Sequence, residues 1–294
     1  MFRYKTHQLW WYIWSKGKRQ DLAPALTAPV RVMNGLDIPS CKEFIMKKIL
    51  PTKLAKEPLI DAVFEVRFSS SFPASDILPG FFFVKLEGDK VMEDLPAAQL
   101  PKAIRDADPN LQFVPIKRLD WDQFFVSIGD RSVAISCKLP YPGWKNFKFA
   151  IIKLMAVLGE IDIIQSIERY SMKYVDLIPS SDLQQQISYI NFDVAIANHK
   201  LQNEAFQLRV EMPRDGFTNA VQVVSSAKLT LPNGEIKEGV VVDVDTIANL
   251  QRVPLPALLD GFEGKLDSIH QTNKTIFFDC LKPETIEALE PSYE

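Results

Sequence analysis

Two cationic side chains, Arg169 and Lys173, lie four residues apart in a stretch whose pattern predicts a β-strand. Polar and apolar residues alternate through Glu168–Tyr174, which is typical of a strand with one buried face. Because alternate side chains project from the same side of a strand, the two cations form a row that can contact an acidic protein partner. The alternative is that they pair with Asp61 and Glu65, which repeat with the same spacing, if the two predicted strands are neighbours.

A pair of carboxylates is the second candidate for chemistry. Asp243 and Asp245 follow a valine run and point to the same face of one predicted strand. Paired carboxylates can bind a divalent cation or share a proton. The local sequence places no third carboxylate or histidine beside them, so the solvent face of a strand explains the pair equally well. We therefore predict no metal site and no catalytic residue here.

The histidines indicate no transition-metal site. His7, His199 and His270 are the only three in the chain, and none has a second ligand at helical or hairpin spacing. His270 flanks an apolar helical stripe, which predicts a histidine packed between helix and sheet. The alternative is a pocket lined by His270, Tyr174 and Asp176, in which a small ligand would bind.

Several common enzyme motifs do not occur in this sequence. It contains no Gly-x-Ser-x-Gly nucleophile elbow, no Gly-x-Gly-x-x-Gly loop and no Walker pattern, so we expect no nucleotide or other cofactor. The cysteines, Cys41, Cys137 and Cys280, are widely separated and form no Cys-x-x-Cys pair. This pattern favours a reducing cytoplasm over a disulfide framework.

The composition is that of a globular protein with a distinctive N-terminal segment. The 294 residues carry a net charge of −3, which gives no reason to expect nucleic-acid binding. Residues 1–45 hold three of the five tryptophans and a formal charge of +4, from seven Lys/Arg and three Asp/Glu. The aromatic run Leu9–Trp14 is far shorter than the roughly 20 residues of a membrane-spanning helix. We interpret residues 1–45 as a disordered or non-native extension, with Met46 as the natural start.

Alternation and helical spacing organise the rest of the chain into two similar halves, residues 46–180 and 181–294. In the first half, Pro58–Phe68 predicts a strand, Phe124–Cys137 a hairpin and Gly143–Gly159 a long helix. We also expect a short strand at Phe81–Val84 and a short helix within Leu100–Ala107.

The second half repeats this organisation. Ser180–Gln186 predicts a loop, Ile190–Ile196 and Phe206–Met212 predict strands, Leu229–Val244 a hairpin, and Leu255–Lys274 a second long helix. Together these patterns predict an α+β fold of antiparallel strand meanders in two similar halves, each backed by one long helix. Whether the halves form one sheet or two is left open.

Four stretches resemble one protein family. They are Pro58–Phe68, Tyr141-x-Gly143-Trp144-x-x-Phe147, Arg169-x-Ser171-Met172-Lys173-Tyr174-Val175-Asp176-x-Ile178, and His270 followed by Phe277. Over about residues 53–291 the chain is similar to a sporadically distributed, functionally uncharacterised family of prokaryotic proteins of this length. The chain departs from that family at Ser171 and Lys173, where glycine and arginine are usual. The resemblance implies a bacterial or archaeal cytoplasmic protein with the patchy occurrence of mobile or defence-associated genes, and no known active site.

Two hypotheses for the function follow from the sequence. The first is a non-catalytic interaction or accessory protein that contacts another protein through the face carrying Arg169 and Lys173. The second is a small-ligand-binding protein or an unrecognised hydrolase, with a pocket between sheet and helices that includes Tyr174, Asp176 and His270. A pocket lined by these three would favour the second hypothesis, and an exposed apolar patch the first. The oligomeric state is left open.

Overall fold

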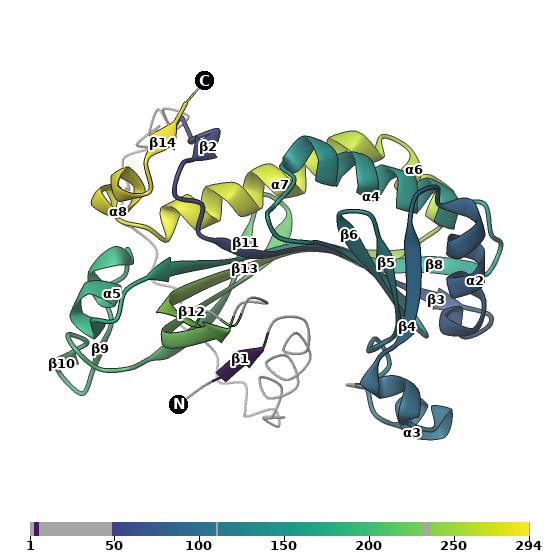
Figure 1. Cartoon of the computed structure of the whole chain (residues 1–294), viewed down its shortest axis with the longest axis horizontal. Coiled ribbons are helices and arrows are strands. Elements are labelled where there is room, and N and C mark those ends of the chain that lie inside the picture. Colours follow the sequence, from purple (N-terminus) through teal and green to yellow (C-terminus); the bar gives the residue numbers. More distant parts are fainter. Residues whose placement is uncertain (1–2, 6–48, 110, 231–233, 235, 294) are drawn as a thin grey trace, which may run out of the picture.

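The computed structural model describes residues 3–5, 49–109, 111–230, 234 and 236–293. It shows an α+β protein in which helices cover one face of a large, curved sheet (Figure 1). Every strand pairing within the described sheet is antiparallel, apart from one short parallel contact at its edge. The predicted α+β class with an antiparallel sheet is therefore confirmed.

The sheet contains strands from both halves of the chain. Its order is β1 (Arg3–Lys5), β12 (Phe217–Thr230), β13 (Ile236–Val253), β8 (Ile164–Pro179), β3 (Leu59–Ser70), β7 (Ser132–Cys137), β6 (Phe124–Gly129), β5 (Pro115–Trp121) and β4 (Lys90–Asp94), with β11 (Gln207–Arg214) also paired to β12. Strand β8 is hydrogen-bonded to β3 on one side and to β13 on the other. One sheet thus contains strands from both sides of residue 180, where the sequence predicted the boundary between the two halves. The division of the chain into two units stays a prediction.

The clearest strand predictions are confirmed. The predicted strand Pro58–Phe68 is β3, and the predicted hairpin Phe124–Cys137 is the antiparallel pair β6 and β7. The stretch Phe206–Met212 is β11, and Leu229–Val244 falls in the hairpin of β12 and β13. Strands β3, β6 and β7 bury their apolar side chains against helices, which is the condition that produces alternation in a sequence, whereas β11 alternates but is largely exposed.

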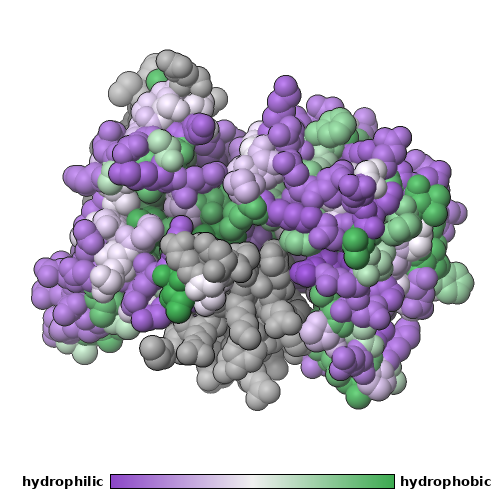
Figure 2. Space-filling view, in the orientation of Figure 1, coloured by the Kyte–Doolittle hydropathy of each residue, from purple (hydrophilic) through white to green (hydrophobic). Residues whose placement is uncertain are grey.

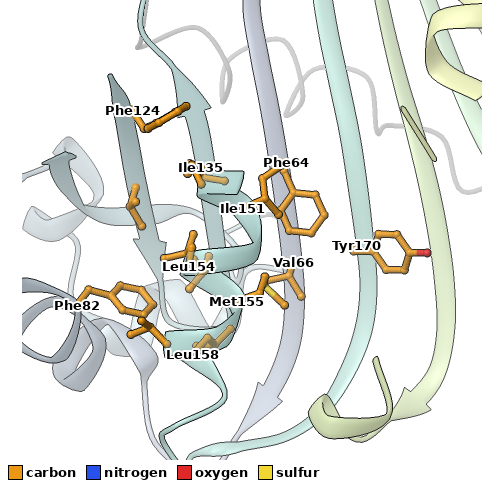
Figure 3. Packing of buried hydrophobic residues seen from close by; sticks show 14 of the residues in the cluster. Phe64, Val66, Phe82, Phe124, Ile135, Ile151, Leu154, Met155, Leu158 and Tyr170 are labelled. Atoms are coloured by element: carbon orange, nitrogen blue, oxygen red, sulfur yellow. The ribbon is translucent and has the colours of Figure 1, made fainter. Parts of the chain in front are cut away.

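Four helices pack on the same face of the sheet, which we call the helix face. They are α2 (Ala74–Lys85), α4 (Trp144–Leu158), α6 (Leu255–Leu259) and α7 (Phe262–Asp279). In Figure 3, Ile151 and Met155 of α4 lie against Phe64 and Val66 of β3, and Leu154 lies nearer to Ile135 of β7. Burying each such large side chain stabilises the fold by about 1.5–3 kcal/mol relative to leaving it exposed. The opposite side, with Arg169 and Lys173, is called the open face.

The long C-terminal helix predicted over Leu255–Lys274 is two helices. The chain turns at Gly261, whose φ of 62° lies in the left-handed region, and this separates α6 from α7. Glycine adopts this conformation without steric strain. Because Leu258 and Phe262 on either side of the turn are both buried, the apolar spacing continued through it and hid the break from the sequence pattern.

Two strand predictions between residues 80 and 200 are wrong. Phe81–Val84 is part of α2, where Phe82 is buried and Phe83 is exposed, as on one side of a helix. The predicted strand Ile190–Ile196 is replaced by a single bridge between Ile190 and Leu281, followed by a two-residue strand. In both cases a short apolar run satisfied the pattern of a strand, whereas tertiary contacts decided the conformation.

The predicted loop Ser180–Gln186 is also wrong, because most of it belongs to helix α5 (Leu183–Tyr189). The side chain of Asp182 accepts a hydrogen bond from the backbone N–H of Gln184 at 3.0 Å, which caps the first turn. Gln186 is fully buried, and its amide donates to the backbone oxygen of Ser180 at 2.8 Å. A cap and a buried amide hold a polar helix that shows no apolar stripe.

Short elements complete the described structure. Helix α3 (Lys102–Ala107) confirms the helix predicted within Leu100–Ala107. The others are β2 (Lys53–Leu54) paired with β14 (Pro291–Ser292), β9 (Ala195–Ile196) paired with β10 (His199–Lys200), the 3-10 turn Pro96–Gln99, and α8 (Pro283–Ala288).

Of the predicted N-terminal extension, the structure describes only β1, whose backbone pairs in parallel with Lys228–Thr230 of β12. The other residues of that segment, and so most of the prediction, lie outside the described residues. Within the described part of the chain, no helix has the length and apolar character needed to cross a membrane. The described surface seen in Figure 2 is mostly hydrophilic, with smaller hydrophobic areas between.

Candidate functional site

Strand β8 divides the candidate residues between the two faces of the sheet. Arg169 and Lys173 project from the open face, whereas Tyr174 and Asp176 project from the helix face. His270 lies on α7, which packs on the helix face, and its ring is 5.8 Å from that of Tyr174. The structure therefore brings together Tyr174, Asp176 and His270 as one group and places Arg169 and Lys173 elsewhere.

The two cations of the open face are engaged by carboxylates of the neighbouring strands. Lys173 Nζ lies 2.8 Å from Asp243 Oδ2, and Arg169 Nη2 lies 3.3 Å from Glu65 Oε2 and 3.9 Å from Asp245 Oδ2. The cross-strand pairing with Glu65 is the one that the alternative interpretation expected. Such pairs contribute roughly 0.2–1 kcal/mol each. A contact role for Arg169 and Lys173 stays a prediction.

Burial and the neighbouring charges act in opposite directions on the pKa values of this network. Burial opposes the charge of Lys173, but Asp243 and Asp245 outweigh it and raise the lysine pKa. Burial also raises the pKa of Asp245, against the opposing effect of Arg169 and Lys173. Arg169 Nε and Asp245 Oδ1 are buried without a hydrogen bond. Asp243 and Asp245 are thus partners of cations, and no three metal-binding side chains gather anywhere among the described residues.

On the helix face, four aromatic side chains meet, and we call them the aromatic cluster: Tyr141, Trp144, Tyr174 and His270. The hydroxyls of Tyr141 and Tyr174 are 3.1 Å apart, and their rings meet edge to face at 6.1 Å. The imidazole of His270 stacks on the indole of Trp144 at 3.9 Å with an angle of 3° between the planes. All four side chains are partly accessible to solvent.

A tight turn before α4 brings two of these rings to the cluster. Gly143 has a φ of 86°, which an L-residue adopts only with strain, and α4 begins at the next residue. The turn leaves Tyr141 over Tyr174 of the sheet and Trp144 beside α7. The Trp144 indole N–H also donates to Asp267 Oδ1 at 3.4 Å, which ties the first turn of α4 to α7.

The imidazole of His270 is neutral at physiological pH. Burial and, to a smaller extent, the charge of Lys274 lower its pKa to about 3, while Asp267 opposes the shift. Its ring nitrogens make no hydrogen bond with the described residues, and the ring packs against those of Trp144 and Tyr174. A neutral imidazole of this kind can donate or accept one hydrogen bond to a bound molecule.

Asp176 is the most unusual group of the site. It follows Tyr174 on the same side of β8 and is 6% exposed. Within the described part of the chain, its carboxyl makes no ion pair or hydrogen bond. Burial raises its pKa well above the usual value, and the carboxyls of Glu57 and Asp243 add to the shift. Burial and the nearby acidic groups therefore both favour the neutral form of this carboxyl.

The sequence singled out three residues of this site and missed three others. Tyr141 and Trp144 were used only as a turn signal and as part of the resemblance, although aromatic residues that flank a Pro-Gly turn before a helix are placed to meet the sheet. Glu57 precedes β3, and its pKa is raised first by partial burial. No local pattern distinguished it from an ordinary surface carboxylate.

The comparisons with known proteins add no assignment. Neither the family models nor the curated protein sequences searched contain a match to this chain. The resemblance to a prokaryotic family described above therefore stays a prediction, and the function is argued from the site.

Proposed function

We propose that this protein is a non-catalytic binding protein whose site, formed by the aromatic cluster and Asp176, holds a small organic cation between sheet and helices. The observation that carries this proposal is the Asp176 carboxyl, buried to 6% exposure without a hydrogen-bond or ion-pair partner among the described residues. A largely buried carboxyl that makes no hydrogen bond with the described residues and lies near accessible aromatic rings is suited to a ligand site.

The chemistry of the surrounding rings favours a cation over an anion or a neutral molecule. Aromatic faces attract ammonium groups through their quadrupole, and the attraction grows as the site is shielded from water. Burial raises the pKa of Asp176 first, and the carboxyls of Glu57 and Asp243 add to the shift, so negative charge lies close to the site although Asp243 is itself paired with Lys173. A bound cation would lower the pKa of Asp176 and favour the ionised carboxylate, which would act as its counter-ion.

Binding without catalysis is favoured by the state of the nearby titratable groups. A general base works best with a pKa near the working pH, whereas the pKa of His270 is about 3. Burial raises the pKa of the Cys137 thiol, which disfavours the reactive thiolate. Both tyrosines of the pair, Tyr141 and Tyr174, have pKa values raised first by burial. These groups are suited to donating hydrogen bonds rather than to transferring protons.

The interaction-protein hypothesis receives less support from the open face. Arg169 and Lys173 lie within 4 Å of Glu65, Asp245 and Asp243. The two cations proposed to contact an acidic partner therefore already form ion pairs within the sheet. We further propose a cytoplasmic, prokaryotic protein, on the basis of its cysteine pattern and of the family resemblance.

The experiment compares choline with its uncharged isostere 3,3-dimethylbutan-1-ol by isothermal titration calorimetry. We expect the wild-type protein to bind choline at least about tenfold more tightly than the alcohol, a difference typical of a desolvated cation on aromatic rings beside a carboxylate. Asp176→Asn should remove most of this preference, because it keeps the shape of the side chain and abolishes its charge. Tyr170→Phe, a buried hydroxyl deletion on the same side of β8, is the matched control.

The pH dependence gives an independent check. Choline binds the ionised carboxyl, so its affinity should rise with pH until the raised pKa of Asp176 in the free protein is passed, and then become constant. Asp176→Asn should show a flat profile. Equal affinities for choline and the alcohol, or an Asp176→Asn variant that retains the wild-type preference, would refute the proposal.

A further inference from the structure

The outer edge of β11 is an exposed strand edge on the far side of the molecule from β4. Strand β11 pairs with β12 through all eight of its residues, and no described strand pairs with its other edge. Six of its residues, Arg209–Arg214, are exposed. An open edge presents a row of backbone N–H and C=O groups that can pair with another chain.

The hairpin geometry determines which backbone groups point outward. Strands β11 and β12 are joined by the two residues Asp215 and Gly216, whose φ values of 53° and 80° are those of a type I′ turn. The residues that flank such a turn, here Arg214 and Phe217, form a hydrogen-bonded pair, and hydrogen-bonded residues then alternate along the strand. The N–H and C=O groups of Arg209 and Glu211 therefore point away from β12.

The position of Pro213 agrees with this assignment. By the same alternation Pro213 is an outward-facing residue, where its missing N–H removes nothing from the β11–β12 ladder. Gln207, Arg209 and Glu211 remain as outward residues that can both donate and accept. They offer a segment of regular edge for a further antiparallel strand.

From this geometry we infer that a second copy of the chain occupies the edge, with the two β11 strands pairing antiparallel about a two-fold axis through Val210. In this register Arg209 of each copy lies opposite Glu211 of the other, and each such pair exchanges two backbone hydrogen bonds. The two Val210 side chains face each other in the closer, non-hydrogen-bonded pair. Leu208 of each copy then lies opposite Met212 of the other.

The side chains of β11 are complementary to themselves only in this register. Arg209 and Glu211 lie on the open face, beside Gln222 and Ala220 of β12, and already form an ion pair with each other at 2.5 Å. Sliding the partner strand by two residues in either direction would place Arg209 opposite Arg209 or Glu211 opposite Glu211. Like charges directly opposite one another destabilise a strand pair.

Burial of the apolar side chains of β11 would also stabilise the dimer in this register. Val210 is 53% exposed and Met212 is 38% exposed, and both lie on the helix face next to Val221 and Asn219 of β12. Val221 belongs to the buried cluster beneath α7. A second β11 would extend this apolar surface and cover Val210 and Met212 of each copy.

Charge reversal with sedimentation equilibrium tests the pairing. We expect the full-length protein to be a dimer, and Arg209→Glu or Glu211→Arg alone to raise its dissociation constant at least about tenfold, because two opposite-charge pairs become two like-charge pairs. The double swap Arg209→Glu/Glu211→Arg should restore the wild-type constant. Lys56→Glu, which reverses an exposed cation in an ion pair outside β11, is the matched control and should have no effect.

Cross-linking tests the position of the two-fold axis. Val210→Cys places two cysteines opposite each other in a non-hydrogen-bonded pair, at a distance that a disulfide can bridge, so mild oxidation should yield a covalent dimer. Leu208→Cys faces Met212 of the other copy and should yield none. A monomeric wild-type protein, a double swap that fails to restore association, or efficient cross-linking through Leu208→Cys would overturn the inference.

Discussion

The amide of Asn273 joins α7 to the centre of the sheet, and its replacement gives the sharpest test of how the two layers are held together. Asn273 is 1% exposed. Its Nδ2 lies 3.0 Å from the backbone oxygen of Met172 in β8, 2.8 Å from that of Val244 in β13, and 3.1 Å from the hydroxyl of Thr246. The two hydrogens of one amide thus serve three acceptors on two neighbouring strands.

The loss of stability expected on replacing Asn273 follows from the two N–H hydrogens of its amide, and not from its three contacts. A buried neutral hydrogen bond contributes about 1–1.5 kcal/mol net, so Asn273→Ala should lower the free energy of unfolding by about 2–3 kcal/mol. Asn273→Asp keeps the shape but points a carboxylate at the backbone carbonyl oxygens of Met172 and Val244, which can only accept hydrogen bonds. A buried charge without a partner should destabilise by about 4 kcal/mol or more at neutral pH.

The sign of the pH dependence separates this explanation from a simple loss of packing. In Asn273→Asp the buried carboxyl has a folded-state pKa raised above the unfolded value of about 3.9, so stability is fully present below that value and is lost as the pH rises through the folded-state pKa. Urea denaturation at acidic and neutral pH measures the difference. Gln271→Glu is the matched amide-to-carboxylate control on the exposed side of α7 and should change stability by less than about 0.5 kcal/mol. An Asn273→Asp variant no less stable than Asn273→Ala at neutral pH would refute the reasoning.

Two further predictions concern the core and the aromatic cluster. Leu154→Ala and Phe262→Ala remove side chains that are 1% and 5% exposed, and each should lower the free energy of unfolding by about 2–5 kcal/mol in denaturant titrations; a change below about 0.5 kcal/mol would contradict their burial. Because the pKa of His270 is about 3 in the folded state and about 6.5 when unfolded, its contribution to stability is present above the unfolded value and is lost as the pH falls toward the folded one. The free energy of unfolding should therefore fall less steeply on acidification in His270→Gln than in the wild-type protein, and identical slopes would argue that the imidazole is not buried.

Part of the candidate site could be predicted from the sequence because alternation assigns side chains to faces. The opposite directions of Lys173 and Tyr174 follow from their adjacent positions in β8, and the helical stripe that ends near His270 indicates which side of α7 meets the sheet. Tyr174, Asp176 and His270 were accordingly proposed together, and the structure places them on one face. Trp144 was missed as a ring of the site because its stacking on His270 joins two helices that are far apart in the chain.

The errors in the predicted secondary structure also arise from contacts between segments that are far apart in the chain. Phe81–Val84 is too short for its period to separate a strand from a helix, and the buried side of α2 was decided by packing against β5 and β6. Helix α5 depends on the cap from Asp182 and on the burial of Gln186, neither of which produces an apolar stripe. Local patterns report the burial of apolar side chains and say little about buried polar ones.

By itself, the sequence determined the α+β class, the strand β3, the hairpin of β6 and β7, and the helix α4, because burial of their apolar side chains leaves a period of two or 3.6 in the order of the residues. Only the tertiary structure decided that β8 lies between β3 and β13. That order pairs Arg169 with Glu65 and Lys173 with Asp243, and it leaves Asp176 buried without a partner among the described residues. The physical reason is that strand order and ion pairing depend on contacts between distant segments, to which no local periodicity corresponds.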